Sequence, residues 1–85
     1  MSGMDVQAVR QLATQLKAAG DQITQLTQKL TSQLNSTTWQ GSDQQRFSND
    51  WQSQYRTSLT NVADALRQAG ELANRNAQEQ EQASS

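Results

Sequence analysis

Residues 34–47, Leu-Asn-Ser-Thr-Thr-Trp-Gln-Gly-Ser-Asp-Gln-Gln-Arg-Phe, are the stretch that decides the fold of this chain. They stand near the middle of its 85 residues, between two segments that each carry a helical pattern of apolar residues. The polar side chains of residues 35–38 compete with a helix because they bond to nearby backbone groups. Gly41 can adopt the left-handed conformation that a tight reversal needs. The stretch therefore predicts a turn between two helices, at residues 37–42.

Toward the N-terminus, residues 5–36 have the pattern of one long amphipathic helix. Ser2 and Asp5 resemble a capping box at its start, with Asp in place of the usual Glu. The apolar residues form two series with a seven-residue repeat, and these series predict an a/d seam. The series are Val9, Leu16, Ile23 and Leu30, then Leu12, Ala19 and Leu26, with Val6, Ala13 and Leu34 widening the stripe.

Gly20 interrupts this pattern, and a glycine in a helix interior costs about 1 kcal/mol relative to alanine. One interpretation is that the first helix stops at Gly20 and a second one restarts at Asp21. However, Leu16 and Ile23 keep the same helical phase across the glycine. We therefore predict a continuous helix in which Gly20 lets a neighbouring backbone or a large side chain come close.

Toward the C-terminus, residues 42–77 predict a second helix. Ser42 and Gln45 have the spacing of a capping box, and Asp43 suits the positive end of the helix dipole. The apolar residues follow at spacings of three and four: Phe47, Trp51, Tyr55, Leu59, Val62, Leu66, Ala69 and Leu72. The stripe then ends, and residues 78–85, which are rich in Gln and Glu, are expected to form a flexible tail.

The expected fold is all-α, an antiparallel two-helix hairpin that forms a single domain over residues 1–85. Counting outward from the turn, the pairs expected to face each other are Leu34 and Phe47, Leu30 and Trp51, Leu26 and Tyr55, Leu16 and Leu66, and Val9 and Leu72. Two helices alone leave one side of each stripe in water, and monomers rarely tolerate so large an apolar patch. The hairpin is therefore expected to dimerise into a four-helix bundle. The expected interface residues are Leu16, Ile23, Leu26, Val62 and Leu66.

The composition excludes several classes of function. The net charge is -1 and the basic residues are dispersed, so neither nucleic acid nor an anionic membrane is an expected partner. Without Cys or His, the chain lacks the usual zinc ligands and the commonest general base. Trp51 and Tyr55 could suggest an aromatic ligand site, but their helical spacing favours core packing. Asp43 and Asp50 could form a carboxylate pair, but catalysis or metal binding would need further groups beside them, and the chain has no His or Cys. We expect no enzyme activity, metal, cofactor or small-molecule substrate.

The sequence also bears on localisation. No apolar run approaches the roughly 20 residues of a membrane-spanning helix. The N-terminal residues lack the basic start and apolar stretch of a general secretory signal. If the protein is exported, its export route must recognise a feature other than a general secretory signal.

Trp39-Gln40-Gly41, placed between two amphipathic helices in a short chain with few charges, resembles the WXG family of small type VII (ESX) secretion substrates, also called the early-secreted-antigen-like family. The resemblance covers nearly the whole chain. Leu66-Arg67-Gln68-Ala69-Gly70 and the Gln/Glu-rich tail look like the actinobacterial members. The resemblance implies a protein made in the cytoplasm and secreted folded, with another WXG-type chain (itself or a sister subunit) and the type VII secretion ATPase as partners.

One feature of the family is missing. Members or their partners usually carry Tyr-x-x-x-Asp/Glu just beyond the second helix as an export signal. The matching C-terminal recognition segment here begins at Ala73 and ends at Ala77, and no Tyr follows Tyr55. Either the partner carries this signal or the signal of this chain has diverged.

Trp39 and Gly41 are the expected export and turn motif, and Trp39 has two possible roles. It either packs on Phe47 and Leu34 to close the end of the bundle, or forms part of a composite export surface. Because Trp39 lies outside both helix stripes, we expect it to be exposed at the turn. The alternative function for the whole chain is an intracellular helical-hairpin scaffold or regulatory interaction module.

Overall fold

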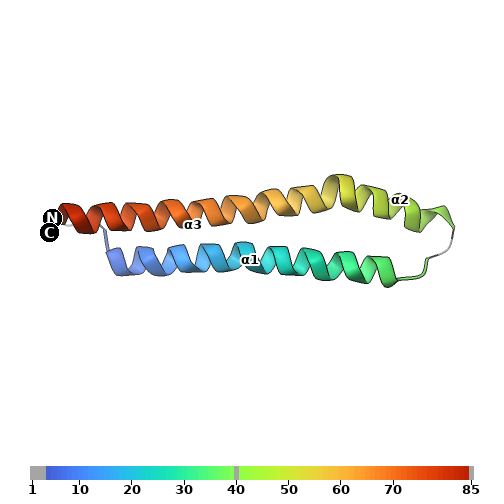
Figure 1. Ribbon diagram of the computed structural model, residues 1–85, viewed down its shortest axis with the longest axis horizontal. Helices are drawn as coiled ribbons and strands as arrows, with labels where there is room; N and C mark the ends of the chain where they lie inside the picture. Colours follow the sequence, from blue (N-terminus) through green and yellow to red (C-terminus); the bar gives the residue numbers. More distant parts are fainter. Residues whose placement is uncertain (1–3, 40, 85) are drawn as a thin grey trace.

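The protein is a long helical hairpin (Figure 1). The computed structural model describes residues 4–39 and 41–84, and no strand occurs among them. The helical segments are α1 (Val6–Ser36), α2 (Ser42–Asp50), the π-helical turn η1 (Trp51–Tyr55) and α3 (Arg56–Ser84). The last three follow one another without a break and form a second arm antiparallel to α1 (Figure 1). The expected all-α hairpin is confirmed.

The start of α1 differs in detail from the expected capping box. Asp5 is itself the N-cap, and its carboxylate accepts a hydrogen bond from the backbone N–H of Ala8 at 3.1 Å. Ser2 lies outside the described residues. From Val6 the helix runs through Gly20 without interruption to Ser36, as predicted.

The turn is held by the polar side chains that precede it. The hydroxyls of Ser36 and Thr37 both donate to the carbonyl of Gln33, at 3.0 and 2.6 Å, which ends α1. On the far side, the amide of Gln44 donates to the carbonyl of Thr37 at 2.8 Å. These bonds confirm that this polar stretch competes with the helix for backbone partners.

The predicted capping box of Ser42 and Gln45 is wrong. Gly41 occupies the N-cap position and Ser42 is already the first residue of α2. The backbone of Gly41 has φ 64° and ψ -146°. The positive φ was expected, but this ψ belongs to an extended region almost confined to glycine rather than to the left-handed helical region.

The second arm contains a π-helical turn that the sequence analysis did not anticipate. Phe47, Trp51, Tyr55 and Leu59 follow one another in steps of four, and each such step overshoots one α-helical turn by about 40°. A π-turn uses more residues per turn and so removes the accumulated drift. As a result these four side chains line a single groove.

The predicted flexible tail is also wrong, because α3 continues to Ser84. Gln, Glu and Ala are good helix formers, so these residues extend a helix once it is anchored. Two contacts with α1 provide the anchor. Ala77 is completely buried, and Glu81 forms an ion pair with Arg10 at 3.1 Å.

The interhelical seam, the line along which the two arms touch, consists mainly of small residues. The buried residues repeat every seven positions on both arms. They are Ala13, Gly20, Thr27 and Leu34 on α1 and Ala63, Gly70 and Ala77 on α3. The predicted seam through Leu16 and Ile23 is therefore wrong for the contact within one chain. Large side chains there would hold the helices apart, whereas small ones let the backbones approach.

Candidate interaction surface

The two arms come closest at two glycines. A Cβ atom on Gly20 would lie 2.8 Å from the carbonyl oxygen of Ala63, and one on Gly70 would lie 2.8 Å from that of Ala13. Real Cβ atoms do not approach backbone oxygens so closely. The prediction that Gly20 admits a neighbouring backbone is confirmed, and Gly70 does the same for the other arm.

A long basic side chain also crosses each glycine. A Cβ on Gly20 would be 2.9 Å from Cγ of Arg67, and one on Gly70 would be 2.8 Å from Cγ of Lys17. The aliphatic parts of these side chains therefore cover the glycines and add apolar contact to the seam. The two crossings are equivalent, because Arg67 of α3 covers Gly20 of α1 and Lys17 of α1 covers Gly70 of α3.

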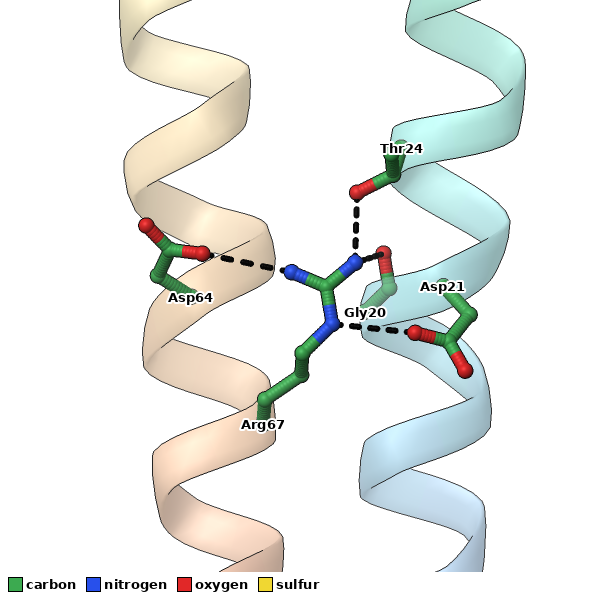
Figure 2. A network of polar contacts seen from close by, with 5 residues as sticks. All are labelled: Gly20, Asp21, Thr24, Asp64 and Arg67. Atoms are coloured by element: carbon green, nitrogen blue, oxygen red, sulfur yellow. Dashed lines mark hydrogen bonds and ion pairs between the residues drawn. The ribbon is translucent and has the colours of Figure 1, made fainter.

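Arg67 ties the arms together on one side of the seam (Figure 2). Its guanidinium donates to Asp21 Oδ1 at 2.9 Å, Thr24 Oγ1 at 2.6 Å, the Gly20 carbonyl at 3.3 Å and Asp64 Oδ1 at 3.2 Å. The side chain is 32% exposed and that of Asp21 is 64% exposed, so water weakens the charge attraction. The network sets the register of the helices more than it stabilises them.

These equivalent contacts reveal an internal repeat that the sequence analysis missed. Residues 12–23 read LATQLKAAGDQI, and residues 62–73 read VADALRQAGELA. The shared pattern is apolar-Ala-x-x-Leu-basic-x-Ala-Gly-acidic. The repeat is visible in the sequence, but the heptad pattern of large apolar residues does not reveal it, because that pattern is defined within each helix separately.

The two sides of the hairpin differ sharply in polarity. In each helix, residues four positions before a seam residue lie on one flank and residues four positions after it lie on the other. Because the helices are antiparallel, the flank that precedes the seam residues on α1 faces the same side of the hairpin as the flank that precedes them on α3. Arg10, Lys17, Thr24 and Arg67 share the polar side. The opposite side, which we call the apolar face, carries Val9, Leu12, Leu16, Ile23, Leu26 and Leu30 of α1 with Leu59, Val62 and Leu66 of α3.

The apolar face is largely uncovered. Leu26 is 54% exposed and Val62 is 48% exposed, while Leu16, Ile23 and Leu66 are half-buried. All five predicted interface residues therefore lie on this face and keep accessible surface. The reason is the small-residue seam, which leaves the large apolar side chains at its edge rather than between the helices.

Aromatic side chains gather at the turn end of the apolar face. Phe47 lies between Trp39 and Tyr55, with ring centroids 5.0 and 6.4 Å away. An open groove of about 450 Å³ runs along Phe47, Trp51, Tyr55, Ser58 and Leu59. Phe47 and Tyr55 are 40% and 50% exposed, so the aromatic residues expected to pack inside the hairpin mostly line its surface.

Trp51 is the exception within this group, because its polar atom is directed inward. The indole N–H donates to the hydroxyl of Thr31 at 2.8 Å, and that hydroxyl donates to the carbonyl of Thr27 at 2.8 Å. With its N–H already bonded, Trp51 presents only its apolar ring to the groove. A molecule seated there would meet carbon surface almost alone.

Trp39 is half-buried rather than exposed as expected. Its ring packs against that of Phe47 at a tilt of 52°, and it lines a second groove of about 200 Å³ with residues of both arms. The lining includes Leu34 with Phe47 and Leu30 with Trp51, two of the five pairs expected to face each other. Trp39 therefore closes the end of the hairpin with one part of its ring and keeps another part accessible.

The C-terminal recognition segment is divided in the same way. Ala73 is half-buried, but Ala77 is fully buried against α1. Contact of a partner with Ala77 would require the end of α3 to separate from α1. The buried position of Ala77 gives it a packing role in the hairpin.

Comparison with protein-family models, with curated proteins and with solved structures finds no match for this chain. Across residues 4–39 and 41–84, no helix combines the length and the apolar character needed to cross a membrane. The apolar face and its aromatic turn end form the candidate interaction surface of the hairpin.

Proposed function

We propose that this chain is a small WXG-type protein, a substrate and export partner of a type VII (ESX) secretion system. It is made in the cytoplasm and is secreted without a general secretory signal. It acts by association with another WXG-type chain and by recognition of that complex by the secretion ATPase, and it has no catalytic role.

A single arrangement carries this proposal: Trp39 at the tip of a long helical hairpin whose small-residue seam leaves its large apolar side chains outside. A hairpin that folds alone would gain more from turning its leucines inward. The exposed Leu12 and Leu26 instead favour a fold completed by a second chain into a four-helix bundle. Such assembly by surface contact needs no catalytic group.

Trp39 supplies the specific part of the proposal. It is accessible in part, it lies beside the aromatic groove, and the turn that places it contains a glycine with a backbone conformation that other residues avoid. Since Tyr-x-x-x-Asp/Glu is absent and Ala77 is buried, we assign the C-terminal export signal to the partner chain.

The test is secretion by a host with an intact type VII system, compared with the same host lacking the secretion ATPase. We expect secretion of the wild-type chain only where the ATPase is present. Trp39→Ala should lower stability by about 1–2 kcal/mol, because a half-buried aromatic pair is lost. Secretion of the folded variant should fall at least tenfold, roughly the loss expected when a recognition contact is removed.

The matched control is Trp39→Phe, which keeps an aromatic ring against Phe47 and should keep most of the stability. Normal secretion of folded Trp39→Ala, or a stability loss above about 3 kcal/mol, would assign Trp39 to packing alone. Retention of the wild-type chain in the cell within a larger complex would instead support an intracellular scaffold.

A further inference from the structure

The polar side of the hairpin carries two pockets between α1 and α3. The first, which we call the Arg10 pocket, has a volume of about 350 Å³ and is lined by Arg10, Asn74, Gln78, Glu81 and Gln82. The second, the Arg56 pocket, has a volume of about 230 Å³ and is lined by Thr24, Thr27, Gln28, Arg56, Thr60 and Arg67. The first lies toward the chain ends and the second toward the turn, with the two glycine crossings between them.

The two pockets occupy equivalent places in the hairpin. The internal repeat relates positions that are fifty residues apart, and the same offset relates three residues of one pocket to three of the other. These pairs are Thr24 with Asn74, Gln28 with Gln78, and Thr60 with Arg10. The close approaches at Gly20 and Gly70 are also equal, at 2.8 Å. The hairpin therefore builds the same pocket twice, with different side chains.

The two pockets differ in how their arginines are paired. In the Arg10 pocket, Glu81 supplies a carboxylate to Arg10 at 3.1 Å. None of the described residues that line the Arg56 pocket is acidic. Arg67 already has two carboxylates as partners (Figure 2). Arg56, in contrast, forms no ion pair with any residue of 4–39 or 41–84, and it donates to the amide oxygen of Gln52 at 2.9 Å.

The Arg56 pocket offers several hydrogen-bond donors to an anion. A guanidinium has five N–H donors, and Gln52 occupies one of those of Arg56. The hydroxyl of Thr24 accepts from Arg67 at 2.6 Å, so its own hydrogen remains for an acceptor (Figure 2). No hydrogen bond joins the hydroxyl of Thr60 to another residue in the described part of the chain. A carboxylate can accept from all three groups, and arginine binds it with two parallel bonds.

The size of the Arg56 pocket favours a side chain over a whole small molecule. Pockets for drug-sized ligands have volumes of about 300–1,000 Å³, and this one has about 230 Å³. The aliphatic part of Arg67 and the threonines of the lining provide carbon surface for the methylene groups of a glutamate. In the equivalent pocket, a glutamate presented by a helix already meets the arginine.

We propose that the Arg56 pocket binds a glutamate side chain of a partner protein that lies along the polar side. This carboxylate takes the role that Glu81 has in the Arg10 pocket, and it accepts hydrogen bonds from Arg56 and Thr60. An ion pair at an exposed site contributes little affinity, so the contact selects an acidic partner more than it tightens the complex. The apolar face and the turn remain free, and the inference goes beyond the proposed function.

The experiment uses a capped alanine pentapeptide with one central glutamate as the probe. It is titrated into the isotope-labelled full-length chain at neutral pH and constant ionic strength, and binding is followed by nuclear magnetic resonance. We expect saturable shifts of the Nε–H signal of Arg56 and of the backbone amide signals of Thr24 and Thr60. The dissociation constant should be about 1–10 mM, and the same peptide with glutamine in place of glutamate should produce no such shifts.

Arg56→Gln should weaken binding of the glutamate peptide at least about threefold, because it removes the charge of the site. Arg75→Gln is the matched control, since Arg75 is exposed on α3 outside both pockets. It should leave binding unchanged. Circular dichroism should show both variants helical. Equal binding by wild-type protein and folded Arg56→Gln would overturn the inference.

Glu81→Gln tests the comparison between the two pockets. It removes the carboxylate that pairs with Arg10 while it keeps the size of the side chain. We expect the variant to gain a second site, so that the glutamate peptide also shifts the Nε–H signal of Arg10. Without that gain, an arginine left unpaired at this place in the hairpin would not be a carboxylate site, and the inference would fail.

Two further outcomes count against a glutamate of a partner protein. One is a wild-type chain that shows no saturable shift or responds equally to the glutamine peptide. The other is tighter binding of inorganic phosphate, titrated in the same way, which would make the pocket a site for free anions. None of these measurements involves secretion or association through the apolar face, so their result is independent of the proposed function.

Discussion

Gly20 and Gly70 determine how closely the two arms of the hairpin approach. In a helix they are unfavourable residues, so their presence at buried positions needs a gain elsewhere. The gain is contact between helical backbones, covered on each side by the aliphatic part of Lys17 or Arg67. At the scale of the residue, the smallest side chains define the fold and the largest are available for other contacts.

Gly20→Ala and Gly70→Ala test this arrangement. Alanine is the better helix former by about 1 kcal/mol, yet its Cβ would meet a backbone oxygen that cannot move independently. We expect each substitution to lower the free energy of unfolding by about 1–2 kcal/mol, because the overlap outweighs the gain in propensity. Urea unfolding followed by circular dichroism, at one protein concentration, measures the change.

Ser32→Ala is the control, since Ser32 is exposed on α1 and alanine is the better helix former there. It should leave stability unchanged or raise it slightly. If Gly20→Ala also raised stability, the arms would be free to separate, and the close approach would not be what holds them.

The π-helical turn η1 is the feature that matters at the scale of the element. In a regular α-helix, the apolar residues before and after η1 would point in different directions. The π-turn places them on the same side of the second arm. Phe47 and Tyr55 are eight residues apart, which exceeds two α-helical turns by about 80°. With the π-turn between them they line one groove, and the indole N–H of Trp51 reaches Thr31 on the other arm.

Deletion of Ser53 should convert η1 into a regular α-helix. Phe47 and Tyr55 would then be seven residues apart, which is two α-helical turns, and both would keep their present direction. We expect the free energy of unfolding to change by less than about 1 kcal/mol, as for surface changes that disturb no buried contact. Thermal melting and tryptophan fluorescence would show whether the aromatic groove is preserved.

Deletion of Gln25 from α1 is the comparison, because α1 has no π-turn to absorb the loss. It would rotate the rest of α1 by about 100° and move Thr27 and Leu34 away from the seam. The cost should reach several kcal/mol, as when buried apolar contacts are lost. If the two deletions lowered the free energy of unfolding equally, η1 would not be a place where the second arm accommodates one extra residue.

At the scale of the whole molecule, the hairpin is a rod with little interior. Its buried apolar residues are Ala13, Leu34, Ala63 and Ala77, and no large side chain in the described part of the chain is fully buried. A chain of this size buries a smaller fraction of its surface than a larger domain does, even when it is compact. The stability of the rod is therefore expected to depend on what covers its apolar face.

If a second chain supplies that cover, the melting temperature must depend on concentration. Dissociation accompanies unfolding of a dimer, so dilution favours the unfolded state. We expect the melting temperature to fall by about 3–5 °C for each tenfold dilution. Calorimetry over a hundredfold range of concentration measures this, and a constant melting temperature would show that the hairpin is stable by itself.

The sequence by itself determined the features that depend on local preference. The apolar periodicity predicted both helices, the polar residues before Trp39 predicted where α1 ends, and Gly41 predicted a backbone with positive φ. The same reasoning failed for residues 78–84, because they continue α3 without an apolar stripe of their own. Their helix is secured by the Arg10–Glu81 pair and by Ala77, which are contacts between distant parts of the chain.

Only the tertiary structure decided which residues the two arms place between them. Hydrophobic pattern ranks positions by apolar character and therefore selected Leu16 and Ile23. The contact between two antiparallel helices is decided by size, because the backbones approach only where side chains are absent or short. Gly20 and Gly70 meet that condition, and the leucines are consequently turned to the apolar face, where a second chain can reach them.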